Sequence, residues 1–579
     1  MLVLFSSGTG HSTPTQLCIG IQLEHLAAKG GSAECPPRQL PMCFARCMFK
    51  TSGLGYLLAL RTAALFDSSG NWTQRLWRYG TVAQLRELLD LAANHSALGA
   101  RTYALGSTRR LLERDPVIAG RTRGLIFGCL PNTKNIERFV LYSNSYLLLH
   151  EAVNSLEEEY IQLWIDFITN AGEDTAPSSI NLDVDLCSWL IGSHLRNSGL
   201  SDTWIINHCY YELRRKANPS SMANILEVAD RVIRQEEGLY QFLIPLELSA
   251  HINSRTGPPW LSRAAFTARF NEVFPTVEVP PNAGGLELEI MALDKYTAQS
   301  AALKKLLQTE MRVSLSSNKR RFVHENEAWM HPGSLKVDLS VRPRAEFRVR
   351  VLDADGGRLL FHRLSSEIEA ALDLLTGITS GSERVACVGA WSALESLLAD
   401  PGDFGNLSEV ADRAADILVC CYVTDIFVNL ATASMRGTPD QLSASLVGKT
   451  DEERISIIES HLQSGGAISA GEGMGAVVAD QVARLVRSPG AVEDLHADIS
   501  AALRRLYQAR NEIVHAGALE PYGIDMILIS AQVLLSRLIN KAIVVSRHPG
   551  DAVGLLAAKA HWSLQRTQDR QSLSLLGTV

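Results

Sequence analysis

The sequence has no regular cysteine framework, and this absence excludes a small scaffold held together by disulfides. Its ten cysteines are scattered over 579 residues, and several stand in apolar, helix-like runs where two sulfurs would lack disulfide geometry. This usage favours a reducing cytosol, so we expect a cytoplasmic protein. Cys35, Cys43 and Cys47 are followed by no second Cys or His pair at finger-like spacing, and no metal site is predicted.

Positive charge is not in excess either. The chain has 55 Lys and Arg against 62 Asp and Glu, a formal net charge of -7 and a pI near 6.1. Such a balance excludes a nonspecific coat for nucleic acid, because phosphate binding needs concentrated basic side chains. Any contact with RNA must therefore be local.

Long apolar runs free of charge are also missing. The best candidate, AADILVCCYVTDIFVNLATA, carries Asp416 and Asp425 and is more typical of a buried helix than of a membrane span. The opening MLVLF lacks a basic segment before it, so no signal peptide is predicted. We expect no membrane association.

The remaining composition, 46% hydrophobic and 20% charged, is that of a globular protein too long for one core. From about residue 80 apolar residues recur at helical spacing, as in TVAQLRELLDLAANHS. We expect helices to continue to about residue 250, where Pro245 ends or kinks the last one. Prolines between 254 and 283 then indicate a boundary.

Strand-like alternation follows this boundary. LELEIMAL alternates, and SLKVDLSVRPRAEFRVRVLDADGGRLLFHRL alternates over two runs around a turn at 355–357, which predicts a small antiparallel sheet. Arg342, Arg344, Arg348 and Arg350 would share one face of it. That face either binds phosphate or is an ordinary solvated strand face.

Two further patterns carry no site. His324 and His331 in HENEAWMH match no helical zinc spacing, and the following Pro-Gly indicates a loop. The glycines between 465 and 475 follow no strand and precede no Lys-Ser or Lys-Thr pair, so they predict a helix connection and not a phosphate loop.

The most informative pattern is RNEIVH at positions 510 to 515. It ends the helix-like run LRRLYQARNEIVHAG, in which Gly517 supplies a stop signal. At about 100° per residue Asn511 and His515 share a face, whereas Arg510 falls on the apolar side. A permanently charged guanidinium there needs an anion, so Arg510 is either half of an ion pair or an anion site. The helix C-terminus favours a protonated His515.

The R-N-x-x-x-H pattern, with AWSALESLL around Glu395 and EVADRAADI around Arg413 before it, resembles the all-helical HEPN superfamily, and most of all its ApeA-like branch. The resemblance covers about residues 361 to 547. It implies a metal-independent ribonuclease without cofactor, in which Arg510 stabilises the phosphate and its transition state, Asn511 orients, and His515 is the general base or acid.

The family's site is formed by two copies of the domain, so one motif per chain implies a homodimer. The resemblance further implies a toxin-like effector of bacterial anti-phage defence, in which residues 48–360 sense an unknown trigger or restrain the nuclease. We expect Glu395 to pair with Arg510 and to hold it toward the pocket.

The alternative is a noncatalytic dimerisation or nucleotide-binding protein, in which Arg510 and Glu395 form a buried salt bridge and His515 merely suits the helix end. In either case the predicted fold class is mainly α, with a helix-rich N-terminal region, a small antiparallel β subdomain and a C-terminal HEPN-like bundle. The predicted division is a turn-rich extension at 1–47, a helix-rich domain at 48–283, a small α+β subdomain at 284–360 and the HEPN-like helical domain at 361–579.

Overall fold

The computed structural model describes residues 53–579 with the exception of 95, 215–221, 249–258, 316–322, 325, 334, 340–346, 354–356, 361–363, 381, 401, 404–407, 437–439, 469–472, 489, 516, 518–520, 548–552 and 571. The predicted extension at 1–47, the arginines Arg342 and Arg344 and part of the predicted turn at 355–357 lie outside these residues.

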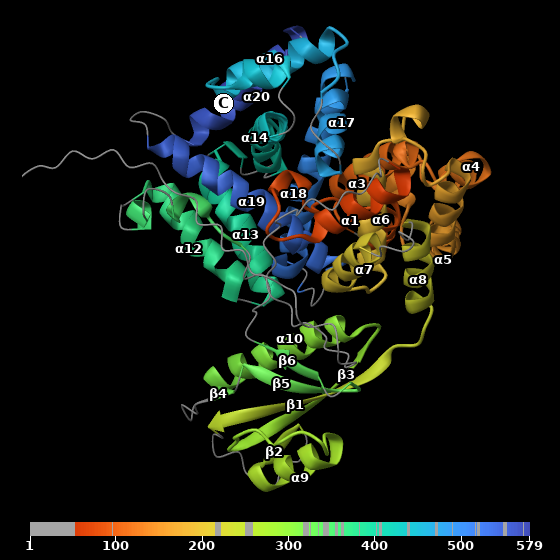
Figure 1. Ribbon diagram of the computed structural model, residues 1–579, viewed down its shortest axis with the longest axis vertical. Coiled ribbons are helices and arrows are strands. Elements are labelled where there is room, and N and C mark those ends of the chain that lie inside the picture. Colours follow the sequence, from red (N-terminus) through yellow and green to blue (C-terminus); the bar gives the residue numbers. More distant parts are fainter. Residues whose placement is uncertain are drawn as a thin grey trace, which may run out of the picture. The chain divides into compact units, whose positions relative to one another are not determined.

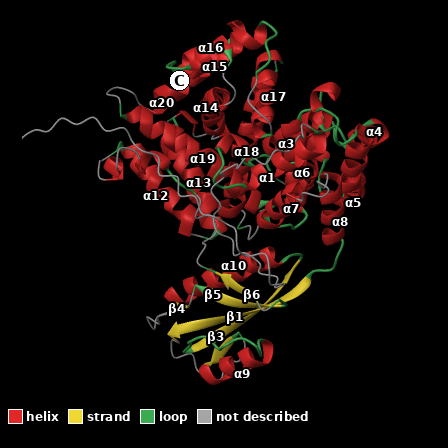
Figure 2. Ribbon diagram, viewed as in Figure 1, coloured by secondary structure: helices red, strands yellow, loops and turns green. Residues whose placement is uncertain are grey.

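The protein is mainly helical with a small antiparallel sheet, which confirms the predicted fold class (Figure 2). The helices before the sheet are α1 (Leu54–Phe66), α2 (Thr81–Ala93), α3 (Leu98–Arg114), α4 (Gly120–Cys129), α5 (Asn144–Ala171), α6 (Val184–Asn197), α7 (Asp202–Arg214) and α8 (Met222–Ile233). Those after it are α12 (Ser366–Ser380), α13 (Glu383–Leu398), α14 (Ser408–Arg436), α15 (Gln441–Leu446), α16 (Asp451–Gln463), α17 (Met474–Arg487), α18 (Ala491–His515), α19 (Ile524–Ser546) and α20 (Val553–Arg570).

These two series of helices share one hydrophobic core, and we call them together the helical body. A single contiguous cluster of buried side chains runs from Leu54 of α1 to Leu576 near the end of the chain. Trp164 and Trp391, one from each series, are among its largest fully buried members. The helices of the predicted helix-rich domain at 48–283 and those of the predicted helical domain at 361–579 therefore pack into one continuous core.

Local sequence signals explain where several of these helices begin and end. Thr450 and Glu453 form the predicted capping box before α16, each side chain bonded to the other's backbone N–H. Helix α18 ends at His515, and Gly517 two residues later has φ +65°, the left-handed conformation of a helix stop. The motif RNEIVH thus occupies the last turns of α18, as its spacing predicts.

The sheet begins earlier in the chain than its sequence predicts. Its strands are β1 (Gly238–Leu248), β2 (Trp260–Ser262), β3 (Gly284–Ala292), β4 (Val323–His324), β5 (Glu327–His331) and β6 (Leu335–Asp338), in the order β2-β3-β1-β5-β6 with β4 also on β1. We call residues 238–339 the sheet domain. Because β1 pairs with β3 over eight residues, the boundary lies near 238 and not at 283.

Two segments differ from their predicted structure. The run GLYQFLIPLEL, expected to continue a helix, is strand β1, and its Pro245 pairs with Gly285 of β3 beyond the stretch that β5 covers. A short apolar run cannot by itself separate helix from strand, and here the partner strand decides. The described residues on either side of the predicted turn at 355–357 are not strands: residues 350–353 before it and 358–360 after it form 3-10 turns. Arg348 lies against α19 through its carbonyl oxygen, which accepts from Ser536.

Two helices cover opposite faces of the sheet (Figure 1). Helix α10 (Lys295–Ser314) packs on the face of Phe242, Ile244 and Leu288, and α9 (Arg263–Val273) packs on the face of Leu243 and Trp329. Gly285 allows α9 to approach, since a Cβ there would lie 2.0 Å from the ring of Phe266. The sheet domain therefore has two small cores of its own.

Few contacts join the sheet domain to the helical body. Asp294, which caps α10, also accepts hydrogen bonds from the backbone N–H and the hydroxyl of Ser201 just before α7, at 3.1 and 3.0 Å. Lys304 of α10 forms an ion pair of 2.8 Å with Glu383 at the start of α13. The sheet domain is thus inserted between the two helical series and tied to both.

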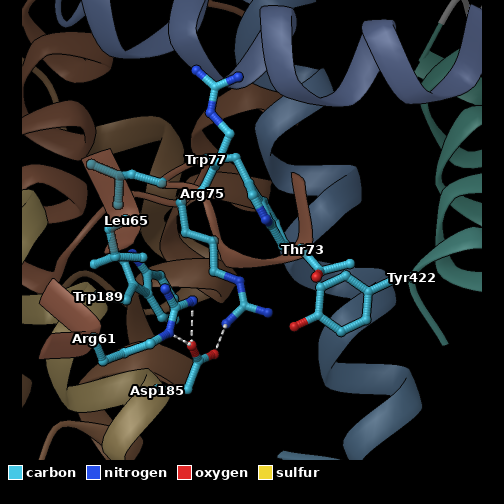
Figure 3. A pocket seen from close by; sticks show the side chains of 10 residues that line it. Arg61, Leu65, Thr73, Arg75, Trp77, Asp185, Trp189 and Tyr422 are labelled. Carbon is cyan, nitrogen blue, oxygen red and sulfur yellow. Dashed lines mark hydrogen bonds and ion pairs between the residues drawn. The ribbon is translucent and has the colours of Figure 1, made fainter. Parts of the chain in front are cut away.

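Buried charges lie where the two series of helices meet. Arg61 of α1, only 2% exposed, forms an ion pair of 2.6 Å with Asp185 of α6, and Figure 3 shows both side chains beside Tyr422 of α14. Burial raises the pKa of Asp185, but Arg61 and Arg78 outweigh it and hold that pKa below its ordinary value. The cavity between them has about 10 Å³, room for one water molecule and not for a ligand.

Helices α14 and α19 are long and apolar enough to cross a membrane, but 67% of the apolar window of each is buried inside the protein. Such burial is typical of helices in a protein core. The composition of the segment AADILVCCYVTDIFVNLATA predicts this for α14. The six cysteines of the described residues are free thiols, and five of them are buried.

Candidate functional site at the end of helix α18

Helix α18 presents the predicted motif at its exposed end. Its inner face is anchored by Leu503, Leu506 and Ala509, each at most 2% exposed. The last turn emerges from the core: Arg510 and Asn511 are half-buried, Val514 is 48% exposed and His515 is exposed. The same helix therefore fixes the motif at one end and opens it to solvent at the other.

The structure brings Arg510, Asn511 and His515 together. Nη1 of Arg510 donates to Oδ1 of Asn511 at 3.0 Å and lies 3.2 Å from Nε2 of His515. Because a guanidinium can only donate, a hydrogen bond at this contact requires Nε2 of His515 as the acceptor and the tautomer with the proton on Nδ1. Arg510 thus orients both neighbours, and Nε2 of His515 can serve as a general base once a substrate anion draws Arg510 away from it.

Part of the Arg510 guanidinium has no partner. Nε of Arg510 is buried and unbonded among the described residues, and only Nη1 makes the two contacts above. A guanidinium presents its donors in a planar fork that matches two oxygens of a phosphate. Because Nε is buried, the donor of Arg510 that remains for an anion beside His515 is Nη2, which makes no hydrogen bond among the described residues.

The predicted pairing of Glu395 with Arg510 is wrong. Glu395 instead accepts a hydrogen bond of 2.7 Å from the indole N–H of Trp391, one turn earlier on α13. Among the described residues no ion pair within 4 Å joins it to Arg510. The indole is a donor on the same helix face at four-residue spacing, whereas Arg510 lies on another helix, so the local partner is favoured. Trp391 in turn packs on Tyr507 of α18 at 4.8 Å, so Glu395 supports the motif helix only indirectly.

A second set of contacts, which the motif spacing does not predict, fixes the opposite face of α18 to the first helical series. Arg505, 8% exposed, forms hydrogen bonds of 2.9 and 2.8 Å with the carboxylate of Glu87 in α2 and lies over the ring of Tyr79 at 4.4 Å. About two turns later, Glu512 inside the motif accepts from Gln508 at 2.9 Å and from Ser96 at 3.5 Å.

Two carboxyl groups meet at this contact. Burial raises the pKa of Asp90, at the end of α2, to about 6, and the nearby Glu512 contributes to the rise. Burial also raises the pKa of Glu512. Neither residue was predicted from the sequence. The signal that the sequence offered is Glu512 itself, which lies about 200° around the helix from Arg510. This face of the motif helix is therefore in contact with the N-terminal helices and carries titratable groups.

The other predicted patterns form no site with the motif. His324 of β4 contacts Glu310 of α10 at 2.9 Å, and His331 lies at the end of β5 opposite Gln241 of β1. Among the described residues no cluster of three His, Cys, Asp or Glu side chains has the geometry for a metal ion. Comparisons with protein-family models, with curated proteins and with solved structures gave no match to this chain.

Proposed function

We propose that this protein is an endoribonuclease of the HEPN type, and that Arg510, Asn511 and His515 are its catalytic residues. The observation that carries the proposal is the hydrogen-bonded trio at the exposed end of α18, in which one guanidinium contacts both the orienting amide and the imidazole. The resemblance of the motif to that superfamily supplies the reaction class.

The reaction consistent with this chemistry is attack of a ribose 2'-hydroxyl on the adjacent phosphate. The bond from phosphorus to the 2'-oxygen forms and the bond to the 5'-oxygen breaks, which leaves a 2',3'-cyclic phosphate and a 5'-hydroxyl. When Arg510 turns from His515 to the phosphate oxygens and neutralises the charge that develops on them, Nε2 of His515 is released and takes the 2'-hydroxyl proton. Asn511 holds Arg510 in position.

A second imidazole would protonate the leaving 5'-oxygen, and we propose that a second copy of the chain supplies it. A twofold interface places the same surface of both subunits face to face, and the exposed Val514 beside His515 offers apolar area for such a contact. Mass measurement in solution tests this step: a dimer is expected, and a monomer that cleaves RNA would contradict it.

We further propose that the protein is a toxin-like effector of anti-phage defence whose N-terminal region restrains the motif. The contacts of Glu87 in α2 with Arg505 and of Ser96, before α3, with Glu512 support this restraint, because they hold the motif helix along the face opposite to Arg510. The resemblance alone supplies the biological setting.

The test is growth after induced expression of the full chain. We expect wild type to arrest growth and both Arg510→Ala and His515→Ala to abolish the arrest at equal protein levels. His150→Ala, which removes a partly exposed histidine of α5 far from the motif in sequence, is the control and should stay toxic. Equal arrest by wild type and His515→Ala would favour the competing function, a noncatalytic dimerisation or nucleotide-binding protein.

A further inference from the structure

The sheet domain contains a pocket of about 640 Å³ on the face that α9 covers only in part. This volume is within the range of pockets that hold small ligands. All of its lining residues belong to the sheet domain, and we call it the sheet pocket. Its lining is Arg263, Thr267, Glu278, Val279, Pro280, Pro281, Asn282, Glu327, Trp329 and Lys336.

The chain's own Lys336 occupies a position that suits a cation. Lys336 of β6 lies directly opposite Trp329 of β5, with its ammonium 5.6 Å from the centre of the indole ring. The same ammonium is 2.5 Å from the carboxylate of Glu327. An aromatic face with an adjacent carboxylate is the setting in which proteins bind ammonium and guanidinium groups. Because Lys336 and Glu327 are 54% and 47% exposed, this arrangement can be displaced at little cost.

The wall of the pocket accepts hydrogen bonds more than it donates them. Pro280 and Pro281 have no backbone N–H, and the amide nitrogen of Asn282 is already used, since it donates to the carbonyl oxygen of Pro280 at 2.9 Å. Oδ1 of Asn282 is buried without a donor among the described residues. Glu278 is exposed and forms no ion pair among the described residues. The complement to this wall is a group with several N–H donors and a positive charge.

Arg263 and Lys336 are the features that would suit an anion instead. Lys336 is already neutralised by Glu327, and Arg263 is an exposed residue of the first turn of α9. A phosphate would lie near the carboxylates of Glu278 and Glu327 and would find no backbone N–H on Pro280 or Pro281. The two basic and two acidic side chains of the lining balance, so the choice rests on the acceptors of the wall and on the indole face of Trp329, which favour a cation.

We propose that the sheet pocket binds a guanidinium or alkylammonium group, and that Lys336 competes for the same place over Trp329. The group can come from a basic side chain of a peptide or from a polyamine. This binding site goes beyond the ribonuclease proposal and does not depend on it.

The experiment measures protection of residues 327–338 against hydrogen exchange in the full chain, as a function of probe concentration. The probes are N-acetyl-arginine amide, spermidine, inorganic phosphate and ATP. We expect saturable protection by at least one of the two cations and none by phosphate or ATP. Protection by the arginine amide alone assigns the source to a peptide side chain, and protection by spermidine alone assigns it to a polyamine.

Two variants should shift the half-saturating concentration of the cation in opposite directions. Lys336→Met removes the competitor and should lower the half-saturating concentration of the cation by about two- to fivefold. Glu278→Gln should raise it by a similar factor, roughly two- to fivefold. Both side chains are at the surface, so neither change should unfold the domain. Lys305→Met is the matched control, because Lys305 contacts the carbonyl of Glu289 from helix α10 on the other side of the sheet.

Two results overturn the proposal. One is saturable protection by phosphate or ATP that Lys336→Met weakens, which would define an anion site. The other is that neither cation protects residues 327–338 in wild type or in Lys336→Met.

Discussion

The helical body and the sheet domain bury their apolar surface in different ways. The helical body uses residues from both ends of the described chain for one core, and it buries charges as pairs such as Arg505 with Glu87 and Arg61 with Asp185. The sheet domain builds two small cores from residues 238–339 alone, and its Lys336–Glu327 pair stays in solvent. The position of the motif therefore depends on residues more than 400 positions away, whereas the sheet pocket depends on its own domain.

The largest expected effect comes from removing one buried ring in each region. Phe427→Ala in α14 and Phe270→Ala in α9 both delete a side chain with no exposure, and each should cost about 3–5 kcal/mol through the cavity it leaves. We expect Phe427→Ala to raise hydrogen exchange in both helical series and Phe270→Ala to raise it only within 238–339. Loosening of α18 by Phe270→Ala would show that the two regions share one cooperative unit.

A slightly smaller effect is expected from the charge pair that joins the two helical series. Glu87→Gln leaves the guanidinium of Arg505 buried without its counter-charge, which should cost about 3 kcal/mol in thermal unfolding and, because it loosens the proposed restraint, raise RNA cleavage by the protein that stays folded. Asp230→Asn is the control, because its partner Arg234 is 56% exposed and the pair is worth less than about 0.5 kcal/mol. Equal shifts for the two variants would mean that α2 does not hold the motif helix.

These contacts also show what the sequence could and could not predict. The helical periodicity of α2, the capping box at Thr450 and the alternation of β3 are local signals, and the structure confirms all three. The gathering of Arg510, Asn511 and His515 follows from spacing on one helix.

The predictions that failed concern contacts between segments that are far apart in the sequence. Strand β1 takes its form from β3, about 40 residues later, and the predicted partner of Arg510 was Glu395, which instead bonds to Trp391 on its own helix. The contact of Glu512 with Ser96 joins residues 416 positions apart. Periodicity reports which face of an element is apolar, but it does not report what covers that face.

The pH dependence of the helical body gives a third test. The pKa of Asp90 is raised to about 6 in the folded protein, so folding favours its protonated form and stability falls as pH rises from about 4 through 6. Asp90→Asn should therefore raise stability at pH 8 by about 1 kcal/mol, after allowance for partial exposure, and leave it unchanged near pH 4. Thermal unfolding at both pH values measures the difference. A stabilisation that is the same at pH 4 and pH 8 would show that the carboxyl charge is not its cause.

The smallest effect is expected at the junction of the two regions. Lys304→Met removes an ion pair with Glu383 whose lysine is 44% exposed, so unfolding should change by less than about 1 kcal/mol. Hydrogen exchange within the cores of both regions should stay as in wild type. A large loss of protection in α13 would contradict this expectation, because it would show that the packing of the helical body depends on this single ion pair with the sheet domain.

The central claim is tested most directly by incubating the purified protein and His515→Ala with a short labelled RNA in EDTA and determining the product ends. The proposed chemistry predicts a 2',3'-cyclic phosphate and a 5'-hydroxyl from wild type, no product from His515→Ala, and no cleavage where the 2'-hydroxyl is replaced by hydrogen. Cleavage by His515→Ala at the wild-type rate, or cleavage at a 2'-deoxy position, would contradict the assignment of Arg510, Asn511 and His515 as a ribonuclease site.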